Sequence, residues 1–255
     1  GDLVTLRSSL RPGATALVWI ETPANPLWTV TDIAAAAELA HQVGAVLAVD
    51  NTAASPVLCQ PLALGADLAF ESATKYLNGH SDVLAGALTT NDPESDLWQQ
   101  LIIERHDSGP VLGAFEAWLL VRGMRTVHLR VRQASAGAMQ IAEALRRHPK
   151  VEVVRYPGLP DDPGHAVSAK QMQGGFGGML SFDVRGGAEA ALALVSRLQL
   201  VIPATSLGGV ESLIEHRATI EGDHSDVPKG LLRLSVGIEN PDDILADIVQ
   251  ALDAV

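Results

Sequence analysis

The sequence DLAFESATKYLNGHS, residues 67–81, is the stretch that indicates the fold of this chain. Its apolar start predicts a buried strand over 67–72, and the polar and small residues that follow predict a turn carrying Ser72, Thr74 and Lys75. In an open α/β sheet, ligands bind at the carboxyl ends of the strands. A lysine flanked by hydroxyl groups there suits a phosphate-bearing aldehyde. A surface lysine at a strand end is the competing interpretation.

Two more apolar runs precede this stretch and predict buried strands, ALVWI at 16–20 and VLAVD at 46–50. Between them we expect a helix with Thr31 as its N-cap and Gly44 directly after it. A further strand is predicted over 84–89. Strands and a helix joined by short links are typical of a parallel α/β sheet.

The pattern changes in the second half of the chain. Residues 111–146 predict helices that are interrupted at Gly123. Beyond them lies an α+β pattern, with strands expected over 151–156, 179–184 and 231–236 and helices over 188–198 and 241–255. We therefore expect two domains, a large one that includes residues 1–124 and a smaller α+β domain over 125–255.

Asp50 ends the predicted strand 46–50, one strand away from Lys75. Neighbouring parallel strands would bring both side chains to the same edge of the sheet. A carboxylate at that edge could keep a pyridine nitrogen protonated, so that the ring accepts electrons from a substrate. From the pattern alone, an Asp that opens the turn DNT is the better interpretation.

Composition narrows the function classes. The 255 residues carry a net charge of −12 without a Lys/Arg cluster, which argues against nucleic-acid or anionic-membrane partners. A single cysteine, Cys59, excludes an internal disulfide. The chain contains no apolar run of membrane-spanning length and no signal-peptide pattern, so we expect a cytoplasmic protein.

Other candidate sites are weaker. The glycine-rich stretch 174–178, GGFGG, lacks the strand-then-helix setting of a dinucleotide loop and predicts a turn between the domains. No HExxH motif or Cys/His ligand spacing is present, so no metal is predicted. The candidate metal ligands in the sequence are His80, Asp82, His216, Asp223, His224 and Asp226.

Five sequence blocks decide between these interpretations. They resemble, in order and spacing, the signature blocks of the cystathionine γ-synthase/γ-lyase and methionine γ-lyase family, which are Cys/Met-metabolism enzymes that use pyridoxal 5'-phosphate (PLP). The blocks are ETPANP (21–26), VDNT (49–52), SATKYLNGHSD (72–82), SLGGVESLIEH (206–216) and LLRLSVGIE (231–239). The resemblance implies an aspartate-aminotransferase-like (fold type I) large domain with a mostly parallel sheet, PLP as cofactor, an amino-acid substrate and a homo-oligomer built as a dimer of dimers.

The resemblance also implies roles for single residues. Lys75 would bind PLP and act as the base, with Asp50 at the ring nitrogen, Thr52 near the ring, Ser72 and Thr74 at the phosphate, and Asn25, Ser206 and Arg233 at the substrate carboxylate. The guanidinium of Arg233 suits this role because it can hold a carboxylate through two parallel hydrogen bonds. Alternation along 231–236 would aim Arg233 into a cleft, although a charge on an edge strand gives the same pattern.

The match to the family is incomplete. Members normally carry a preceding segment, about a third of the protein, that supplies a stacking tyrosine and phosphate contacts, and nothing here matches it. The connection over 217–230 is short, Ala53 follows DNT where an aromatic residue is common, and Thr205 replaces a glutamate found in cystathionine enzymes. Thr205 cannot offer a counter-charge to a distal amine.

We therefore expect γ- or β-elimination or replacement on sulfur amino acids or O-acylhomoserine. The smaller substrates are favoured over cystathionine. A catalytically impaired fragment, or a non-catalytic remnant of such an enzyme, is the alternative.

Overall fold

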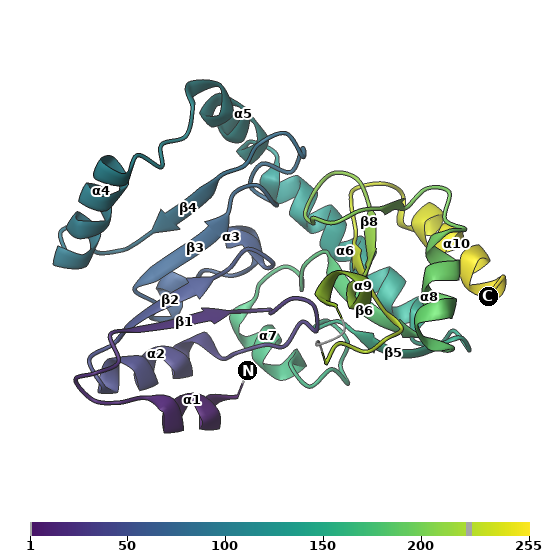
Figure 1. Ribbon diagram of the computed structural model, residues 1–255, viewed down its shortest axis with the longest axis horizontal. Coiled ribbons are helices and arrows are strands. Elements are labelled where there is room, and N and C mark those ends of the chain that lie inside the picture. The colour runs from purple at the N-terminus through teal and green to yellow at the C-terminus, as the bar shows by residue number, and fades with distance from the viewer. Residues whose placement is uncertain (1, 223–225) are drawn as a thin grey trace.

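Two β-sheets, one in each half of the chain, organise the computed structural model, which describes residues 2–222 and 226–255 (Figure 1). The first sheet has the order β1 (Leu17–Glu21), β2 (Val46–Asp50), β3 (Leu68–Ser72) and β4 (Gly86–Thr89). β1, β2 and β3 are parallel, as predicted, whereas β4 runs antiparallel to β3 and begins two residues later than expected. The sheet is therefore mostly parallel with one antiparallel edge strand.

Helix α2 (Ile33–Gln42) covers one face of this sheet. Its cap is Asp32 and not Thr31, because the extended backbone of Asp32 lets its carboxylate accept from Ala35 N at 3.1 Å. Thr31 instead donates its backbone N–H to the hydroxyl of Thr22 at 2.9 Å. Gly44 follows the helix closely, as expected.

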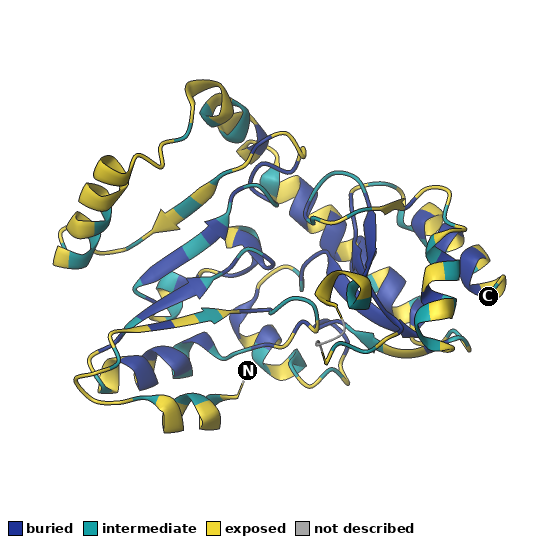
Figure 2. Ribbon diagram, viewed as in Figure 1, coloured by how far each residue is buried: buried dark blue, intermediate teal, exposed yellow. Residues whose placement is uncertain are grey.

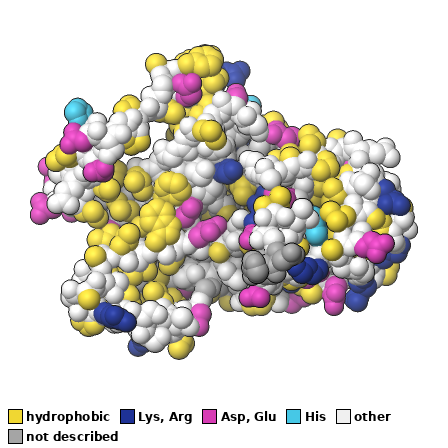
Figure 3. Space-filling model, in the orientation of Figure 1, with side chains coloured by type: hydrophobic (Ala, Val, Ile, Leu, Met, Phe, Trp, Pro, Cys, Tyr) yellow, Lys and Arg dark blue, Asp and Glu magenta, His cyan; other side chains and the backbone are white. Residues whose placement is uncertain are grey.

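The opposite face of the first sheet is largely uncovered. Alternation along β1 buries Val18 against α2 and leaves Leu17 and Trp19 about half exposed on the other side. Trp19 contacts the ring of Phe70 at a centroid distance of 5.6 Å, and Leu88 of β4 is also exposed. Hydrophobic side chains consequently gather over the first sheet on the face drawn in Figure 3.

Two helices project from the first sheet, α4 (Asp96–Ser108) and α5 (Ala114–Met124) (Figure 1). α4 has no buried residue and was not predicted, since its sequence lacks a strong apolar face (Figure 2). The predicted division of 111–146 into two helices is confirmed, but the break falls at 125–126, because α5 continues through Gly123 to Met124. Gly123 is needed for close packing, since a Cβ there would lie 2.3 Å from the carbonyl oxygen of Asn78.

The second half forms a five-stranded sheet that is buried more completely than the first (Figure 2). Its order is β5 (Val151–Arg155), β6 (Met179–Val184), β9 (Leu231–Ser235), β8 (Leu213–His216) and β7 (Ile202–Pro203). Its core also contains buried side chains of α6 (Val127–Leu145), α8 (Gly187–Val195) and α10 (Pro241–Asp253). β5, β6 and β9 match the expectation to within one residue.

Several short elements were not predicted. β7 and β8 are too short for alternation to be recognised in the sequence. The same holds for the short helices, which are α1 (Leu3–Ser9), α3 (Ser55–Leu58), the 3₁₀ helix η1 (Pro61–Leu64), α7 (His165–Gln171) and α9 (Arg217–Glu221). No helix in the described part of the chain is both long and apolar enough to cross a membrane.

Contacts between the halves fix the turn that follows β3. Arg130 of α6 is buried and donates to the carbonyl oxygens of Tyr76 at 2.8 Å and Leu77 at 3.3 Å. A second contact joins the halves where Trp28 Nε1 donates to Ser181 Oγ of β6 at 2.9 Å. The turn at 174–178 then leads from α7, whose C-cap Met172 packs in the first core, into β6 in the second. Both halves are thereby held around the ends of β2, β3 and β9.

Candidate active site

The carboxyl ends of β2 and β3 bring together three predicted site residues. Thr52 Oγ1 accepts a hydrogen bond from the backbone N–H of Ser72 at 2.8 Å. Asp50 Oδ1 accepts from the backbone N–H of Thr52 at 3.0 Å. The carboxylate of Asp50, the hydroxyl of Thr52 and the end of β3 therefore lie at one edge of the sheet.

The turn after β3 carries Thr74 and Lys75. The hydroxyl of Thr74 accepts from the backbone N–H of Ala85 at 2.9 Å and donates to the carbonyl oxygen of Ala85 at 3.3 Å. To donate to a phosphate, this hydroxyl has to release the longer of the two bonds. The backbone N–H of Lys75 donates to Ser72 O at 3.0 Å, which turns the lysine back over the strand end.

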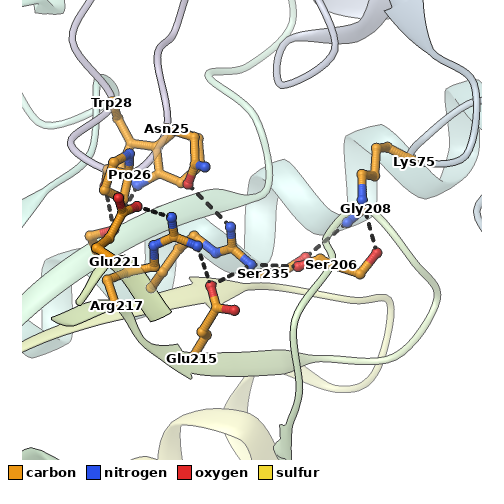
Figure 4. Close-up of polar contacts among 12 residues, drawn as sticks. Asn25, Pro26, Trp28, Lys75, Ser206, Gly208, Glu215, Arg217, Glu221 and Ser235 are labelled. Carbon is orange, nitrogen blue, oxygen red and sulfur yellow. Dashed lines mark hydrogen bonds and ion pairs between the residues drawn. The ribbon is translucent and has the colours of Figure 1, made fainter. Parts of the chain in front are cut away.

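The amine of Lys75 reaches the second half of the chain. Its Nζ donates to Ser206 Oγ at 3.2 Å (Figure 4). Burial lowers the pKa of Lys75, and the positive charge of Arg233 lowers it further, while Glu215 acts in the opposite direction. A lowered pKa increases the fraction of neutral amine, which is the form that attacks an aldehyde or accepts a proton.

Arg233 lies on the central strand of the second sheet, so the edge-strand interpretation is wrong. Its Nη1 donates to Asn25 Oδ1 at 3.2 Å and its Nη2 donates to Ser206 O at 2.8 Å. Only 5% of Arg233 is exposed, so its guanidinium is enclosed by its partners and does not face an open cleft. Arg233 thus contacts both of the other residues predicted to bind a carboxylate.

Asn25 is held by the loop between β1 and α2. Its backbone N–H donates to Glu21 Oε1 at 3.1 Å. Ser181 Oγ donates to the carbonyl oxygen of Pro26 at 2.7 Å while it accepts from Trp28. These bonds tie the loop to β6 of the second sheet and set the position of Asn25 against Arg233.

Two groups of charged residues escaped the sequence analysis. Glu215 of β8 lies opposite Arg233 in the β8–β9 register, and its Oε2 is 2.9 Å from Arg233 Nη2 and 2.6 Å from Arg217 Nη1 (Figure 4). Arg217 also pairs with Glu221. In the sequence, Glu215 is visible only as a glutamate inside the block 206–216. Because no strand is predicted there, the sequence does not show that Glu215 pairs with Arg233 across two neighbouring strands.

The second is Glu71, whose carboxyl group is close enough to Asp50 to be affected by its charge. Glu71 of β3 is buried and accepts from Asn51 Nδ2 at 2.8 Å. Burial raises the pKa of Glu71 to about 7; the hydrogen bond from Asn51 lowers it, and the nearby charge of Asp50 raises it. A buried carboxyl group one residue before Ser72 gave no signal in the sequence beyond its place in an apolar strand.

A cavity of about 620 Å³ opens beside the lysine turn, and its lining includes Thr74, Thr205, Ser206, Asp82 and Glu211. A larger cavity, about 850 Å³, lies between β5 and the loop 27–30 and contains no predicted site residue. Lys75 and Asp50 do not line the first cavity. The donor set at the ends of β2 and β3 fits PLP, since hydroxyls suit a phosphate, Lys75 an aldehyde and Asp50 a pyridine nitrogen.

Among the described residues, no three His, Cys, Asp or Glu side chains are grouped so that they could hold a metal ion. Asp223 and His224, which were weighed as ligands from the sequence, lie outside the described residues. The short connection over 217–230 is described except for 223–225.

Comparison with known proteins identifies relatives along nearly the whole chain. A family profile described as "Cys/Met metabolism PLP-dependent enzyme" matches residues 2–253. A cystathionine gamma-synthase of Mycobacterium tuberculosis (strain H37Rv) is 48% identical over 98% of this chain and 65% of its own length. An L-methionine gamma-lyase of Fusobacterium nucleatum subsp. polymorphum is 43% identical over 94% of this chain and 63% of its own length.

Solved structures give the same result. The structure of metB from Corynebacterium glutamicum aligns with a TM-score of 0.94 and 44% identity, over 99% of this chain and 66% of that one. Apo CalE6, a methionine gamma lyase from Micromonospora echinospora, aligns with a TM-score of 0.89 and 46% identity, over 96% of this chain and 65% of that one. The chain spans about 65% of the length of the curated cystathionine gamma-synthases that it matches.

Proposed function

We propose, since the chain belongs to the family of Cys/Met metabolism PLP-dependent enzymes, that it carries the cofactor lysine and the substrate-carboxylate site of an enzyme that eliminates or replaces a group at the γ- or β-carbon of an amino acid. The substrates are sulfur amino acids or O-acylhomoserine. The observation that carries this proposal is the continuous contact from Lys75 through Ser206 to Arg233 and Asn25.

The residues that would hold PLP lie at the ends of β2 and β3. Lys75 would bind the aldehyde carbon, Asp50 the ring nitrogen, and Ser72 and Thr74 the phosphate, with Thr52 near the ring. When bound, PLP supplies an acceptor for the electrons that are left when a proton leaves the substrate. The lowered pKa of Lys75 and its position 3.2 Å from Ser206 Oγ support its role as the group that accepts and returns protons at the substrate carbons.

The substrate would be an α-amino acid. Arg233 and Asn25 together offer N–H donors and a positive charge to one carboxylate beside the lysine. Ser206 would stand between this carboxylate site and Lys75. Because Thr205 has only a hydroxyl and a methyl group at its end, we propose methionine-like thioethers or O-acylhomoserine as the preferred substrates.

Cystathionine is the second candidate. The cavity beside Thr205 is also lined by the carboxylates of Asp82 and Glu211, which supply negative charge for a distal amine. Several relatives at 46–48% identity are named cystathionine gamma-synthase or cystathionine gamma-lyase.

A competition assay tests the proposal on the protein at its natural length. Specificity constants would be compared for methionine, an O-acylhomoserine and cystathionine in the presence of PLP. We expect turnover of at least one of them, with cystathionine the poorest. Binding of PLP without turnover of any of the three would favour the alternative, a non-catalytic remnant. A preference for cystathionine that survives Thr205→Val would establish the second candidate.

We also propose that the protein assembles into a homo-oligomer, a dimer of dimers. Exposed apolar side chains on α4 and α5, among them Ile103, Phe115 and Trp118, support this because monomeric proteins rarely leave such patches in water. Within the chain, we propose a domain boundary at 124/125, where α5 ends before α6 enters the second core. Light scattering at the natural length and limited proteolysis near Arg125 test these two proposals.

A further inference from the structure

A buried carboxylate lies between two guanidinium groups behind the carboxylate-binding residues. Glu215 Oε2 is 2.9 Å from Arg233 Nη2 and 2.6 Å from Arg217 Nη1. The side chains of Glu215, Arg233 and Arg217 are 5%, 6% and 11% exposed. The second oxygen, Oε1, has no hydrogen-bond partner among the described residues. Glu215 therefore makes all its polar contacts through the one oxygen that the two arginines share (Figure 4).

These contacts fix the orientation of Arg233. Its Nη2 donates to Ser206 O at 2.8 Å and forms an ion pair with Glu215 Oε2 at 2.9 Å. Its Nη1 donates one hydrogen to Asn25 Oδ1. A substrate carboxylate approaching Arg233 consequently meets a guanidinium whose plane is already set by three partners, which lowers the cost of ordering it on binding.

The same carboxylate creates an electrostatic problem. A buried negative charge 2.9 Å from Arg233 offsets the positive charge that would attract a substrate carboxylate, and it repels that carboxylate directly. Arg217 offsets the charge of Glu215 at still shorter range. Glu221 also pairs with Arg217, but its side chain is 31% exposed, so solvent screens its charge more strongly.

We propose that Glu215 and Arg217 are positioning residues for substrate binding: Glu215 orients the guanidinium of Arg233, and Arg217 neutralises Glu215 so that Arg233 keeps its net positive charge for the substrate. This inference rests on the proposed function, in which Arg233 binds the α-carboxylate. Neither Glu215 nor Arg217 touches the substrate in this arrangement. Both act through Arg233.

A purely structural role predicts different behaviour. If the pair only held α9 against the sheet, removing either partner would weaken every property, and removing both would be at least as harmful. If Arg217 instead balances the charge of Glu215, a second substitution at Glu215 should restore the binding that is lost in the Arg217 variant. Loss of Arg217 leaves an uncompensated anion beside Arg233, whereas simultaneous neutralisation of Glu215 removes that anion.

The test measures ligand binding by isothermal titration calorimetry on the PLP-loaded protein at its natural length. The probes are L-norleucine, which has no leaving group, and pentylamine, the same amine without the carboxylate. For Arg217→Met we expect the Kd for norleucine to rise by about tenfold, the middle of the range for charged groups in contact, with little change for pentylamine. Glu215→Gln/Arg217→Met should return the Kd to within about twofold of the original value.

Further variants keep the test decisive if Arg217→Met does not fold. Arg217→Lys keeps the charge and should bind norleucine as the original protein does. Glu215→Gln alone keeps an oxygen that can accept from Arg233 and so retains its orientation; it should bind norleucine more tightly, because the competing anion is gone. Arg146→Met, which breaks the ion pair to Asp161 outside the site, is the matched control and should change neither Kd.

Three results would overturn the inference: unchanged norleucine binding in Arg217→Met, weaker binding in Glu215→Gln, or a double variant as weak as Arg217→Met. Arg233→Met separates this failure from that of the proposed function. If Arg233→Met loses norleucine selectively while Arg217→Met has no effect, only the present inference fails. If Arg233→Met leaves the preference for norleucine over pentylamine intact, the proposed carboxylate site itself is wrong.

Discussion

Lys75 Nζ donates a hydrogen bond to Ser206 Oγ at 3.2 Å although 131 residues separate the two in the chain. The carbonyl oxygen of the same serine accepts from Arg233 Nη2 at 2.8 Å. Ser206 also has a φ of +88°, a left-handed conformation that is uncommon for a residue with a side chain. One strained residue thus joins the lysine of the first sheet to the arginine of the second.

Because of this strain, we expect one substitution at Ser206 to increase stability and decrease activity. Ser206→Gly should raise the free energy of unfolding by about 1 kcal/mol, because glycine adopts positive φ without steric cost. Turnover should fall, since Lys75 loses its hydroxyl partner. Urea unfolding together with steady-state kinetics checks both effects, and Ser206→Ala is the control that loses the hydroxyl but keeps the strain. A glycine variant no more stable than the alanine variant would contradict the strain argument.

Lys75 is predicted to be the residue that binds PLP covalently. After incubation with PLP and reduction with borohydride, peptide mass mapping should find the pyridoxyl label on Lys75. The expectation follows from its lowered pKa and its place at the strand end. Lys150 and Lys170 are internal controls, because both are engaged on the surface, Lys150 with the carbonyl oxygen of Asp253 at 3.0 Å and Lys170 with Asp32 at 2.9 Å. A label confined to either of them would refute the assignment.

Asp50 is predicted to matter more for turnover than for cofactor content. Asp50→Asn keeps the size of the side chain and an oxygen that can accept from Thr52 N, but it loses the charge that would hold a proton on the ring nitrogen. We expect kcat to fall by about a hundredfold or more, with PLP content, read from absorbance after dialysis, close to normal. Full activity in this variant would rule out the electronic role of Asp50.

The buried carboxyl of Glu71 predicts a pH-dependent stability. Its pKa is raised from 4.5 to about 7, so the folded state holds the proton more tightly than the unfolded state. This contribution to stability is complete below pH 4.5 and is lost as pH rises through about 7. A shift of this size corresponds to roughly 3 kcal/mol.

The comparison with Glu71→Gln isolates this effect, since glutamine stays neutral and retains an oxygen for Asn51. Urea unfolding at pH 5 and pH 8 should show the original protein losing stability relative to the variant as the pH rises. If the two proteins have parallel pH profiles, Glu71 does not titrate in this window.

Much of the fold could be predicted because the strands that carry the site are strongly apolar. β2 and β6 were predicted with their observed bounds, and family membership confirms the fold class and the dependence of the family on PLP. The antiparallel β4 could not be predicted, because strand direction depends on which edge the chain returns to. The cap of α2 was misassigned because Thr31 and Asp32 are both good N-caps, and only the backbone angles distinguish them.

Some contacts of the candidate site could likewise be predicted from the sequence, and others could not. The pairing of Asn25 and Ser206 with Arg233 was anticipated from the sequence blocks, and the contacts are present, while the catalytic and binding roles stay predictions. Glu215 and Arg217 were missed because their meaning depends on the register between β8 and β9. Glu71 was missed because a single carboxylate in a strand does not reveal whether its side chain is buried.

The contact between Lys75 and Ser206 has a consequence for synthesis of the protein on the ribosome. The strand ends that would hold the cofactor are complete once residue 75 has been made, but Ser206 lies 131 residues further along the chain and Arg233 follows it. Because domains fold largely in order of synthesis, the nascent first half exposes a reactive amine long before its partner serine and the carboxylate site exist. If Lys75 binds PLP as proposed, a chain that stalls in this interval would capture the aldehyde before the proposed amino-acid site exists.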